Sequence, residues 1–362
     1  MIAVKRNGVM ATRKEVAELA GVSEATVSRV LNGVGPIRKQ TREKVLSAAR
    51  ELGYTPNSLA RNLALKRSGN LGVIMPYLPK ARLFSAYYFS EILNGIGSKA
   101  QQEGYDLLMI FRNAEEPTDY EELFRMHKVD GLVILGAKDE LGEREALRAL
   151  KQNQRPFCVV NQHFDGEDFP EVDADHVEGS YAAAGHLLAE GYRRIAFLNG
   201  PVSYSNSVDR RAGYERALAD YGMIPELQLQ YEGNFSRKSG LAAARDIAAR
   251  LQEMDAVFAA NDRMAIGLIQ GLEAIGTTAA EFPAIVGYDD SDAAEMVTPA
   301  LTSVRVPFFE IGETAAGQVL SNRAGVQELA GRILLPTKLV VRASSLGSAR
   351  QEHCCSLSRR LE

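Results

Sequence analysis

The stretch VAELAGVSEATVSRVLNG, residues 16–33, decides the fold of the N-terminal part of the chain. It contains two short segments of apolar periodicity, separated only by the sequence AGVS. We therefore predict two helices of about two turns each, joined by a tight turn in which Gly21 takes the left-handed conformation. Upstream, Thr12 and Glu15 have the spacing of a capping box, which predicts a first helix over residues 13–20.

Two further helices are expected in this N-terminal head. Ser23 is a favourable N-cap for the second helix, residues 24–31, which ends at Asn32 and Gly33. We expect Thr41 to cap a third helix of sequence REKVLSAAREL, which ends at Gly53. Such an all-α arrangement is typical of a helix-turn-helix head, whose second helix enters the major groove of DNA. A small helical domain for protein contacts is the alternative.

Charge is distributed unevenly along the 362 residues. Residues 1–70 carry 13 Lys and Arg against 5 Asp and Glu, whereas the remainder carries 29 against 41. A basic head on an acidic body indicates that the head meets a polyanion. The chain has no apolar run of membrane-spanning length, no signal-peptide pattern and only three cysteines. We therefore expect a cytoplasmic protein with no metal, cofactor or membrane partner.

Side chains suited to DNA gather on the predicted head. Arg29 carries the forked donors that recognise a guanine edge, and Ala25 suits a thymine methyl group. Hydroxyl side chains near helix N-termini suit phosphate oxygens. We predict that the DNA contacts of the head come from Thr12, Arg13, Ser23, Glu24, Ala25, Thr26, Ser28, Arg29, Asn32, Thr41 and Tyr54.

The segment TPNSLARNLALKRSGN, residues 55–70, follows the head. Pro56 breaks the chain, and the next residues can cap a helix of about eight residues that ends near Lys66. A helix below ~12–15 residues is not stable alone in water. We therefore predict that this hinge is disordered without DNA and folds on it.

A different pattern begins at Leu71. Short β-branched runs alternate with amphipathic helical segments, which predicts parallel sheets with helices on both faces. The seven runs exceed the strands of one typical sheet, so we predict two lobes that face a cleft. Polar residues follow several runs, and ligands of such sheets bind beyond the carboxyl ends of the strands. The runs are LGVIMPYL, DLLMIF, VDGLVILG, PFCVVNQ, RIAFLNG, AVFAAND and PAIVGYD.

Three segments resemble the lac repressor/GalR family of bacterial transcription regulators. They are TRKEVAELAGVSEATVSRVLNG, TREKVLSAARELGYTPNSLARNL and IVGYDD, and the resemblance extends over roughly residues 10–345. It implies a head at 10–56, a hinge helix and linker at 57–68, and an effector-binding and dimerisation domain at 69–348. It implies for that domain the α/β fold of type I periplasmic binding proteins, with two lobes of doubly wound sheets. One lobe is expected at 71–172 plus 307–333 and the other at 173–305 plus 335–345, before a flexible tail at 349–362.

The resemblance also implies how the hinge and the cleft act. Two hinge helices pair across a homodimer in the DNA minor groove, where Leu63 wedges a base step and Ala60 allows close approach; Asn57 belongs to the same DNA-contacting set. In the cleft, Arg210 and Asp289 clamp the effector and Phe235 stacks on it. The implied effector-binding residues are Tyr88, Phe89, Asn161, Arg210, Phe235, Asn261, Asp262 and Asp289.

The functional hypotheses follow from these residues. The chain has no G-x-S-x-G, Walker loop or H-E-x-x-H motif, so we expect no enzyme. GIGSKA at 95–100 matches a loose dinucleotide pattern but lies in a helical run, which indicates close helix packing. We predict a regulator of palindromic operator DNA, most simply a repressor, with a sugar effector such as a maltose-type oligosaccharide. A purine or other non-sugar effector, or a solute-binding protein without a DNA role, is the alternative.

Overall fold

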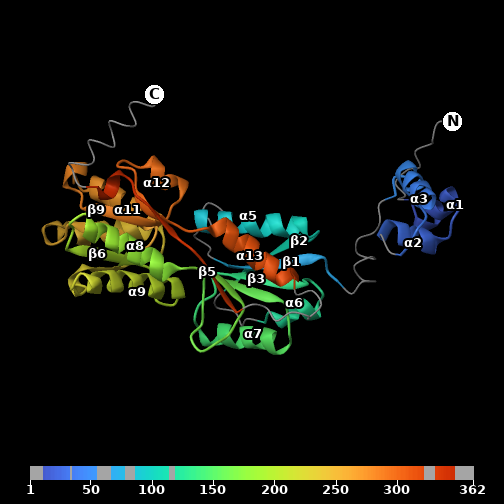
Figure 1. The fold of residues 1–362 in the computed structure, drawn as a ribbon, viewed down its shortest axis with the longest axis horizontal. Helices are drawn as coiled ribbons and strands as arrows, with labels where there is room; N and C mark the ends of the chain where they lie inside the picture. Colours follow the sequence, from blue (N-terminus) through green and yellow to red (C-terminus); the bar gives the residue numbers. More distant parts are fainter. Residues whose placement is uncertain are drawn as a thin grey trace, which may run out of the picture. The chain divides into compact units, whose positions relative to one another are not determined.

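The protein is described here from a computed structural model, which covers residues 11–32, 35–54, 67–77, 86–113, 119–321 and 331–346. The chain forms two compact units, Met1–Gly69 and Asn70–Glu362 (Figure 1). This division places the end of the N-terminal unit next to the predicted start of the effector-binding domain at residue 69. Within the described residues, no helix combines the length and apolar character needed to cross a membrane.

The N-terminal unit contains the three predicted helices, α1 (Arg13–Ala20), α2 (Glu24–Asn32) and α3 (Lys39–Glu51). The capping box is confirmed, because the Glu15 amide donates to Thr12 Oγ1 at 3.3 Å and the Thr12 amide donates to Glu15 Oε2 at 2.8 Å. Gly21 has φ 64° and ends α1. The Ser23 hydroxyl accepts from the Thr26 amide at 3.2 Å and caps α2.

The prediction that Thr41 caps α3 is wrong. The helix begins at Lys39, so Thr41 lies inside its first turn, and the N-cap residue Arg38 makes no side-chain capping bond. Lys and Gln are strong helix formers, so residues 39 and 40 extend the helix before the threonine. Gly53, with φ 63°, follows the C-terminus as predicted. All three helices contribute to one small core of Val16, Ala17, Ala20, Val27, Val30, Val45, Ala48 and Ala49.

The C-terminal unit contains two six-stranded sheets, as the count of strand-like runs indicates. The first has the order β11-β5-β4-β3-β1-β2 and is parallel throughout. Its strands are β1 (Asn70–Pro76), β2 (Asp106–Arg112), β3 (Gly131–Leu135), β4 (Phe157–Val160), β5 (Glu171–Ala174) and β11 (Arg332–Leu335). The second has the order β12-β10-β9-β8-β6-β7, in which only the β10–β12 pair is antiparallel. Its strands are β6 (Ile195–Asn199), β7 (Gln230–Glu232), β8 (Ala256–Ala259), β9 (Ala284–Asp289), β10 (Thr302–Arg305) and β12 (Lys338–Val340).

Helices cover both sheets and complete two lobes (Figure 1). The first lobe has α5 (Tyr87–Gln102), α6 (Glu121–Arg125), α7 (Leu141–Gln152) and α13 (Phe308–Ser321). The second lobe has α8 (His176–Ala189), α9 (Ser205–Asp220), α10 (Arg237–Ala248), α11 (Asp262–Ala274) and α12 (Asp292–Met296). The chain passes between the lobes after β5, after β10 and after β11. The predicted boundaries at 172 and 333 fall two residues early, because β5 continues to Ala174 and β11 to Leu335.

Close helix packing explains the glycines of the GIGSKA sequence. It lies inside α5, and a Cβ atom at Gly95 would overlap the carbonyl oxygen of Phe309 in α13. Gly312 of α13 meets the carbonyl oxygen of Ile92 in the same way. The glycines of α5 and α13 thus allow these two helices to pack closely within the chain.

Candidate functional sites

The N-terminal unit has a hollow beside the start of α2. It has a volume of about 510 Å³ and is lined by Val22, Ser23, Thr26, Arg29, Gly35, Pro36, Ile37, Arg38 and Thr41. Four of these are predicted DNA contacts, namely Ser23, Thr26, Arg29 and Thr41. Hydroxyl groups, two guanidinium groups and the N-terminus of a helix together suit a phosphate group.

The other predicted DNA contacts lie near this hollow or outside the described residues. Thr12 and Ala25 are exposed, Ser28 is half-buried, and Tyr54 packs against the small core. Arg13 Nε and Glu24 Oε2 form an exposed ion pair at 3.2 Å that joins α1 to the first turn of α2. Asn32 ends α2, although its side chain is not described. Asn57, Ala60 and Leu63, and the tail at 349–362, lie outside the described residues.

The C-terminal unit has a cavity of about 590 Å³ between its lobes. The carboxyl ends of strands from both sheets border it, as the sequence predicts. The structure brings together seven of the eight predicted effector-binding residues on its lining: Tyr88, Phe89, Asn161, Arg210, Phe235, Asn261 and Asp289. The cavity is also lined by residues that the sequence pattern did not indicate: Tyr87, Tyr204, Asn206, Asn234, Arg263, Asp292 and Met296. Some signal was present, since Asn234 directly precedes Phe235 and Asn206 lies one helical turn before Arg210.

Arg210 and Asp289 form a buried charged pair at the base of this cavity. Their exposed fractions are 3% and 7%, and Arg210 Nη2 lies 4.0 Å from Asp289 Oδ1. Arg210 Nη1 donates to the carbonyl oxygen of Ala260 at 2.8 Å, and its guanidinium lies 4.2 Å from the ring centre of Tyr288. Burial raises the pKa of Asp289 well above its usual range, and Arg210 opposes this rise. The Nε of Arg210 has no hydrogen-bond partner, so the pair retains capacity to bind a polar ligand.

Asn161 offers a second unused polar group to the cavity. Its side chain is buried, and neither amide atom makes a hydrogen bond. Burial raises the pKa of the Tyr88 phenol, and the neighbouring Asn161 amide opposes this rise. Buried polar groups are normally hydrogen-bonded, so this amide indicates a place for a ligand hydroxyl or a water molecule. The φ of Asn161 is 54°, a left-handed conformation that asparagine tolerates better than most residues.

Aromatic rings form the apolar part of the cavity lining. The ring centres of Phe235 and Tyr204 are 6.0 Å apart, and those of Tyr88 and Phe89 are 4.7 Å apart. Both pairs have edge-to-face geometry. Asn261 supports Phe235, because its Nδ2 donates to the Phe235 carbonyl oxygen at 3.1 Å. Its Oδ1 also accepts from the Met264 amide at 2.9 Å and caps α11. The amide of Asn261 is therefore used within the protein, and it positions the aromatic wall.

Asp262 does not line the cavity, contrary to the sequence expectation. Its side chain is fully buried behind the wall. Oδ1 accepts from the Ser303 hydroxyl at 2.6 Å, and Oδ2 accepts from the amide and hydroxyl of Ser291 at 2.7 and 2.9 Å. Asp262 follows a strand in sequence, but these three donors turn its carboxylate inward, so that it holds the loop after β9.

Comparisons with known proteins match both units of the chain. A family profile described as "Bacterial regulatory proteins, lacI family" matches residues 12–57, and one described as "Periplasmic binding protein-like domain" matches residues 184–345. The HTH-type transcriptional regulator CelR of Thermobifida fusca is 34% identical over 92% of this chain and 98% of its own. The HTH-type transcriptional regulator AscG of Escherichia coli (strain K12) is 33% identical over 86% of this chain and 91% of its own.

Two solved structures are similar over nearly the full chain. A lac repressor dimer bound to operator and the anti-inducer ONPF has a TM-score of 0.81 and 29% identity, covering 94% of this chain and 100% of its own. A complex of the transcriptional regulator CelR with cellobiose has a TM-score of 0.67 and 31% identity, covering 92% of this chain and 99% of its own. The predicted head and two-lobed fold are therefore confirmed.

Proposed function

Because the chain belongs to the lacI family of bacterial regulatory proteins and is a DNA-binding transcriptional regulator rather than an enzyme, we propose that it acts as a homodimeric repressor in the cytoplasm. Two heads bind a palindromic operator, whose half-sites match the twofold symmetry of the dimer. A small-molecule effector in the cavity controls operator affinity by binding one lobe arrangement more tightly than the other.

A sugar is the effector class that the cavity chemistry favours. The single observation that carries this proposal is the buried pair of Arg210 and Asp289 beside the ring of Phe235. Charged and amide groups bind sugar hydroxyls, and an aromatic face covers the apolar side of a sugar ring. The CelR relative was solved with cellobiose and another family member with ribose, at 31% and 27% identity. A maltose-type oligosaccharide remains a candidate within this class, and a purine is the rival, since aromatic and amide groups also suit it.

A thermal-shift panel on the full chain tests the effector class. We expect cellobiose, maltose or another sugar to raise the Tm, whereas adenine and guanine leave it unchanged. At a sugar concentration 100 times the Kd, binding stabilises the folded state by about 2.7 kcal/mol, which corresponds to a shift of roughly 5–10 °C for a domain of this size. A shift with a purine and none with any sugar would reject the proposal.

The variant Asn161→Gly tests whether the Asn161 side chain contributes to the sugar-induced shift in Tm. Glycine accepts the left-handed backbone at this position, and the lost amide has no hydrogen-bond partner in the protein. We therefore expect the Tm of the free chain to change by less than about 3 °C, because no internal hydrogen bond is broken. The sugar-induced shift should largely disappear. A full shift in the variant would exclude Asn161 from the effector site.

Residues 57–68 are proposed as the hinge helix that enters the minor groove. Because an inserted leucine kinks only the operator that it fits, we expect Leu63→Ala to weaken specific binding and to leave non-specific binding nearly unchanged. Fluorescence anisotropy with an operator duplex and with a scrambled duplex measures both. Equal losses on the two duplexes would contradict the wedge.

A further inference from the structure

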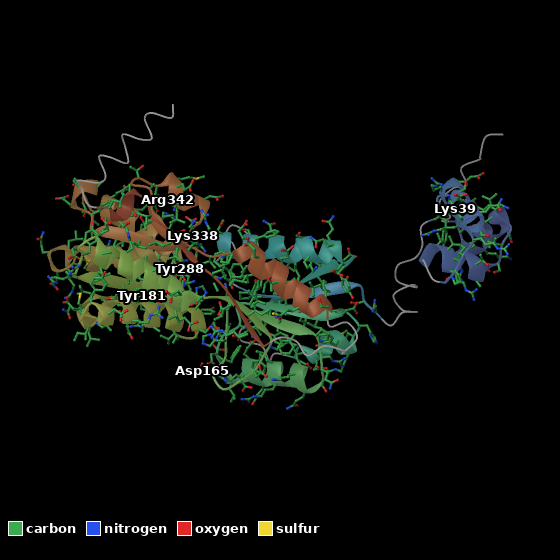
Figure 2. All side chains as sticks on the ribbon, in the orientation of Figure 1. Lys39, Asp165, Tyr181, Tyr288, Lys338 and Arg342 are labelled. Atoms are coloured by element: carbon green, nitrogen blue, oxygen red, sulfur yellow. The ribbon has the colours of Figure 1, made fainter. Side chains whose placement is uncertain are left out.

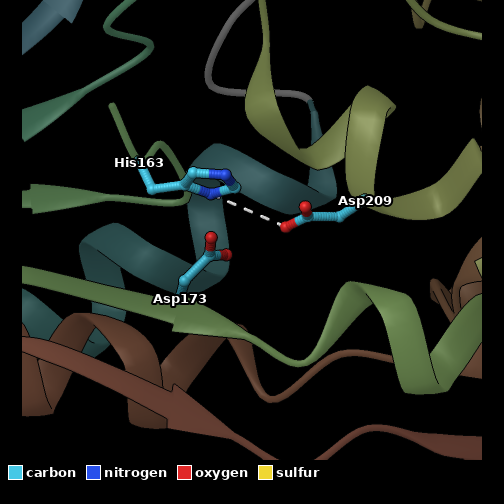
Figure 3. Close-up of side chains that lie close together, drawn as sticks. All are labelled: His163, Asp173 and Asp209. Carbon is cyan, nitrogen blue, oxygen red and sulfur yellow. Dashed lines mark ion pairs between the residues drawn. The ribbon is translucent and has the colours of Figure 1, made fainter. Parts of the chain in front are cut away.

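Charged side chains gather where the chain passes between the two lobes. His163, Asp173 and Asp209 face one another there, as Figure 3 shows. His163 Nδ1 lies 3.6 Å from Asp209 Oδ2. Arg332 Nη2 lies 3.3 Å from Asp209 Oδ2 and 3.5 Å from Asp173 Oδ2. We call these four residues the interlobe cluster.

The cluster joins the lobes through one residue. His163 follows β4, Asp173 lies in β5 and Arg332 lies in β11, all in the first lobe. Asp209 lies in α9 of the second lobe. Its contacts with His163 and Arg332 therefore cross the lobe boundary.

The contacts within the cluster are loose for charged groups, whereas Arg332 Nε lies 2.8 Å from Glu171 Oε1 inside the first lobe. Ionic hydrogen bonds are normally about 2.7–2.9 Å long, so the three distances exceed that range by less than about 1 Å. Asp173 Oδ2 and His163 Nδ1 are buried and make no hydrogen bond. A small relative movement of the lobes is enough to tighten or to break the two pairs that Asp209 forms. Burial raises the pKa of Asp209, with His163 opposing, as expected where ion pairing is incomplete.

A chain of buried contacts leads from the cluster to the cavity. Asp173 Oδ1 lies 3.3 Å from His176 Nε2, and His176 Nδ1 lies 3.1 Å from the Tyr288 hydroxyl. The ring of Tyr288 lies under the guanidinium of Arg210. A ligand that moves Arg210 therefore acts on a continuous set of packed groups that ends at Asp173.

We propose that Asp209 and Arg332 form a latch between the lobes, and that Tyr288 and His176 couple this latch to the state of the cavity. The coupling rests on the proposed effector function, whereas the latch does not. A bound metal ion is a weaker explanation of the cluster, because Arg332 already supplies a positive charge beside both carboxylates.

The latch is tested by measuring the distance between the lobes without any ligand. Spin labels are placed on the exposed positions Leu141→Cys of the first lobe and Leu227→Cys of the second, after Cys158, Cys354 and Cys355 are replaced by alanine or serine. Dilution with unlabelled protein leaves one labelled subunit per dimer. We expect one narrow distance distribution in the parent protein and a second population at longer separation in Asp209→Asn. An unchanged distribution would overturn the latch.

Further variants separate the latch from a general loss of stability. Arg332→Gln should reproduce the second population, and the Asp209→Asn/Arg332→Gln double variant should show no more of it than either single variant. Asp209→Glu keeps the charge and should restore the narrow distribution, which preserves the test if the asparagine variant fails to fold. Glu178→Gln removes an exposed ion pair with Arg216 within the second lobe and should change nothing. Additive effects of the two single variants would also overturn the latch.

Two last arms test the coupling and the metal alternative. Tyr288→Phe removes only the hydroxyl that contacts His176, and we expect it to produce the second population. A narrow distribution in this variant would overturn the coupling and leave the latch intact. Adding Zn²⁺ or EDTA should not alter the parent protein, and a metal-dependent distribution would overturn the latch in favour of a cation site. A thermal-shift panel with no sugar response would reject the proposed effector without affecting these results.

Discussion

Asn261 and Asp262 are neighbours in the sequence, yet their side chains serve different purposes. Both follow strand β8, and the sequence pattern places both near the cavity. Only the structure shows that Asn261 positions Phe235 while Asp262 holds the loop after β9. The local sequence determines where strands and turns occur. The direction of each side chain depends on residues that are distant in sequence, such as Ser291 and Ser303. This is why the pattern identified the cavity and still misassigned one residue.

Asp262 gives a prediction of pH dependence. Burial raises its pKa to about 6, although the hydrogen bonds from Ser303 and Ser291 oppose the rise. A raised folded-state pKa means that protonation favours the folded state, so this contribution is complete below pH 3.8 and is lost as the pH rises through about 6. We expect the free energy of unfolding, relative to Asp262→Asn, to fall between pH 4 and 7 by on the order of 2–3 kcal/mol.

Urea denaturation at several pH values measures this difference. Glu273→Gln, an exposed substitution in α11, serves as the control for general pH effects on the chain. A difference that rises with pH would show that the hydrogen bonds, rather than burial, determine the ionisation of Asp262.

At the scale of elements, long apolar strands were predictable and short edge strands were not. All seven runs became strands, namely β1, β2, β3, β4, β6, β8 and β9. Five strands of three or four residues were not among the predicted runs. They include β7, with the sequence QYE, and β12, with the sequence KLV. Both lie at sheet edges, where half-exposed strands need little apolar periodicity. Their pairing is determined by the neighbouring strand rather than by their own residues.

Strand β2 is another edge strand, and its composition predicts an interface. Leu107, Met109 and Phe111 share one face and are 36%, 36% and 46% exposed. An exposed apolar edge strand is an association site unless it is covered. Because we propose a homodimer, we expect Met109→Lys to shift the chain towards the monomer, which light scattering after size-exclusion chromatography measures. Leu241→Lys, at a position in α10 that is 45% exposed, is the control. A fully dimeric Met109→Lys protein would place the interface elsewhere.

At the scale of the whole molecule, the two units differ in charge, and we expect them to differ in function. We propose that DNA is bound within the basic residues 1–70, because it repels the acidic remainder. The sequence alone predicted this division and the lobe architecture, because charge and strand–helix alternation are properties of composition and order. It did not predict the interlobe cluster. Asp209 and Arg332 are far in sequence from His163 and Asp173, and the fold brings the four residues together.

Basic residues are concentrated in the head. We therefore expect the salt dependence of operator binding to come from phosphate contacts made by the head. Arg29 and Arg38 line the same hollow, yet we expect them to bind different targets. Arg29 lies in α2, the helix that we propose enters the major groove, whereas Arg38 precedes α3. A phosphate contact adds about 0.9 to the magnitude of the slope of log K against log salt concentration. We therefore expect Arg38→Ala to reduce that slope by about 1 and to weaken all duplexes alike. Arg29→Ala should instead reduce the free energy of binding by about 1–3 kcal/mol, and only for the operator duplex.

Anisotropy titrations with a duplex from the DNA flanking the gene, between 50 and 200 mM salt (roughly the range over which phosphate contacts are screened), distinguish the two roles. Lys138→Ala in the acidic body is the control, because its removal does not alter the head. If Arg38→Ala leaves the slope unchanged while Lys138→Ala reduces it, the body contacts the phosphates, and the assignment of DNA binding to the basic head fails. An unchanged slope in both variants would instead remove Arg38 from the phosphate contacts and leave the other hydroxyl and guanidinium groups of the hollow to make them.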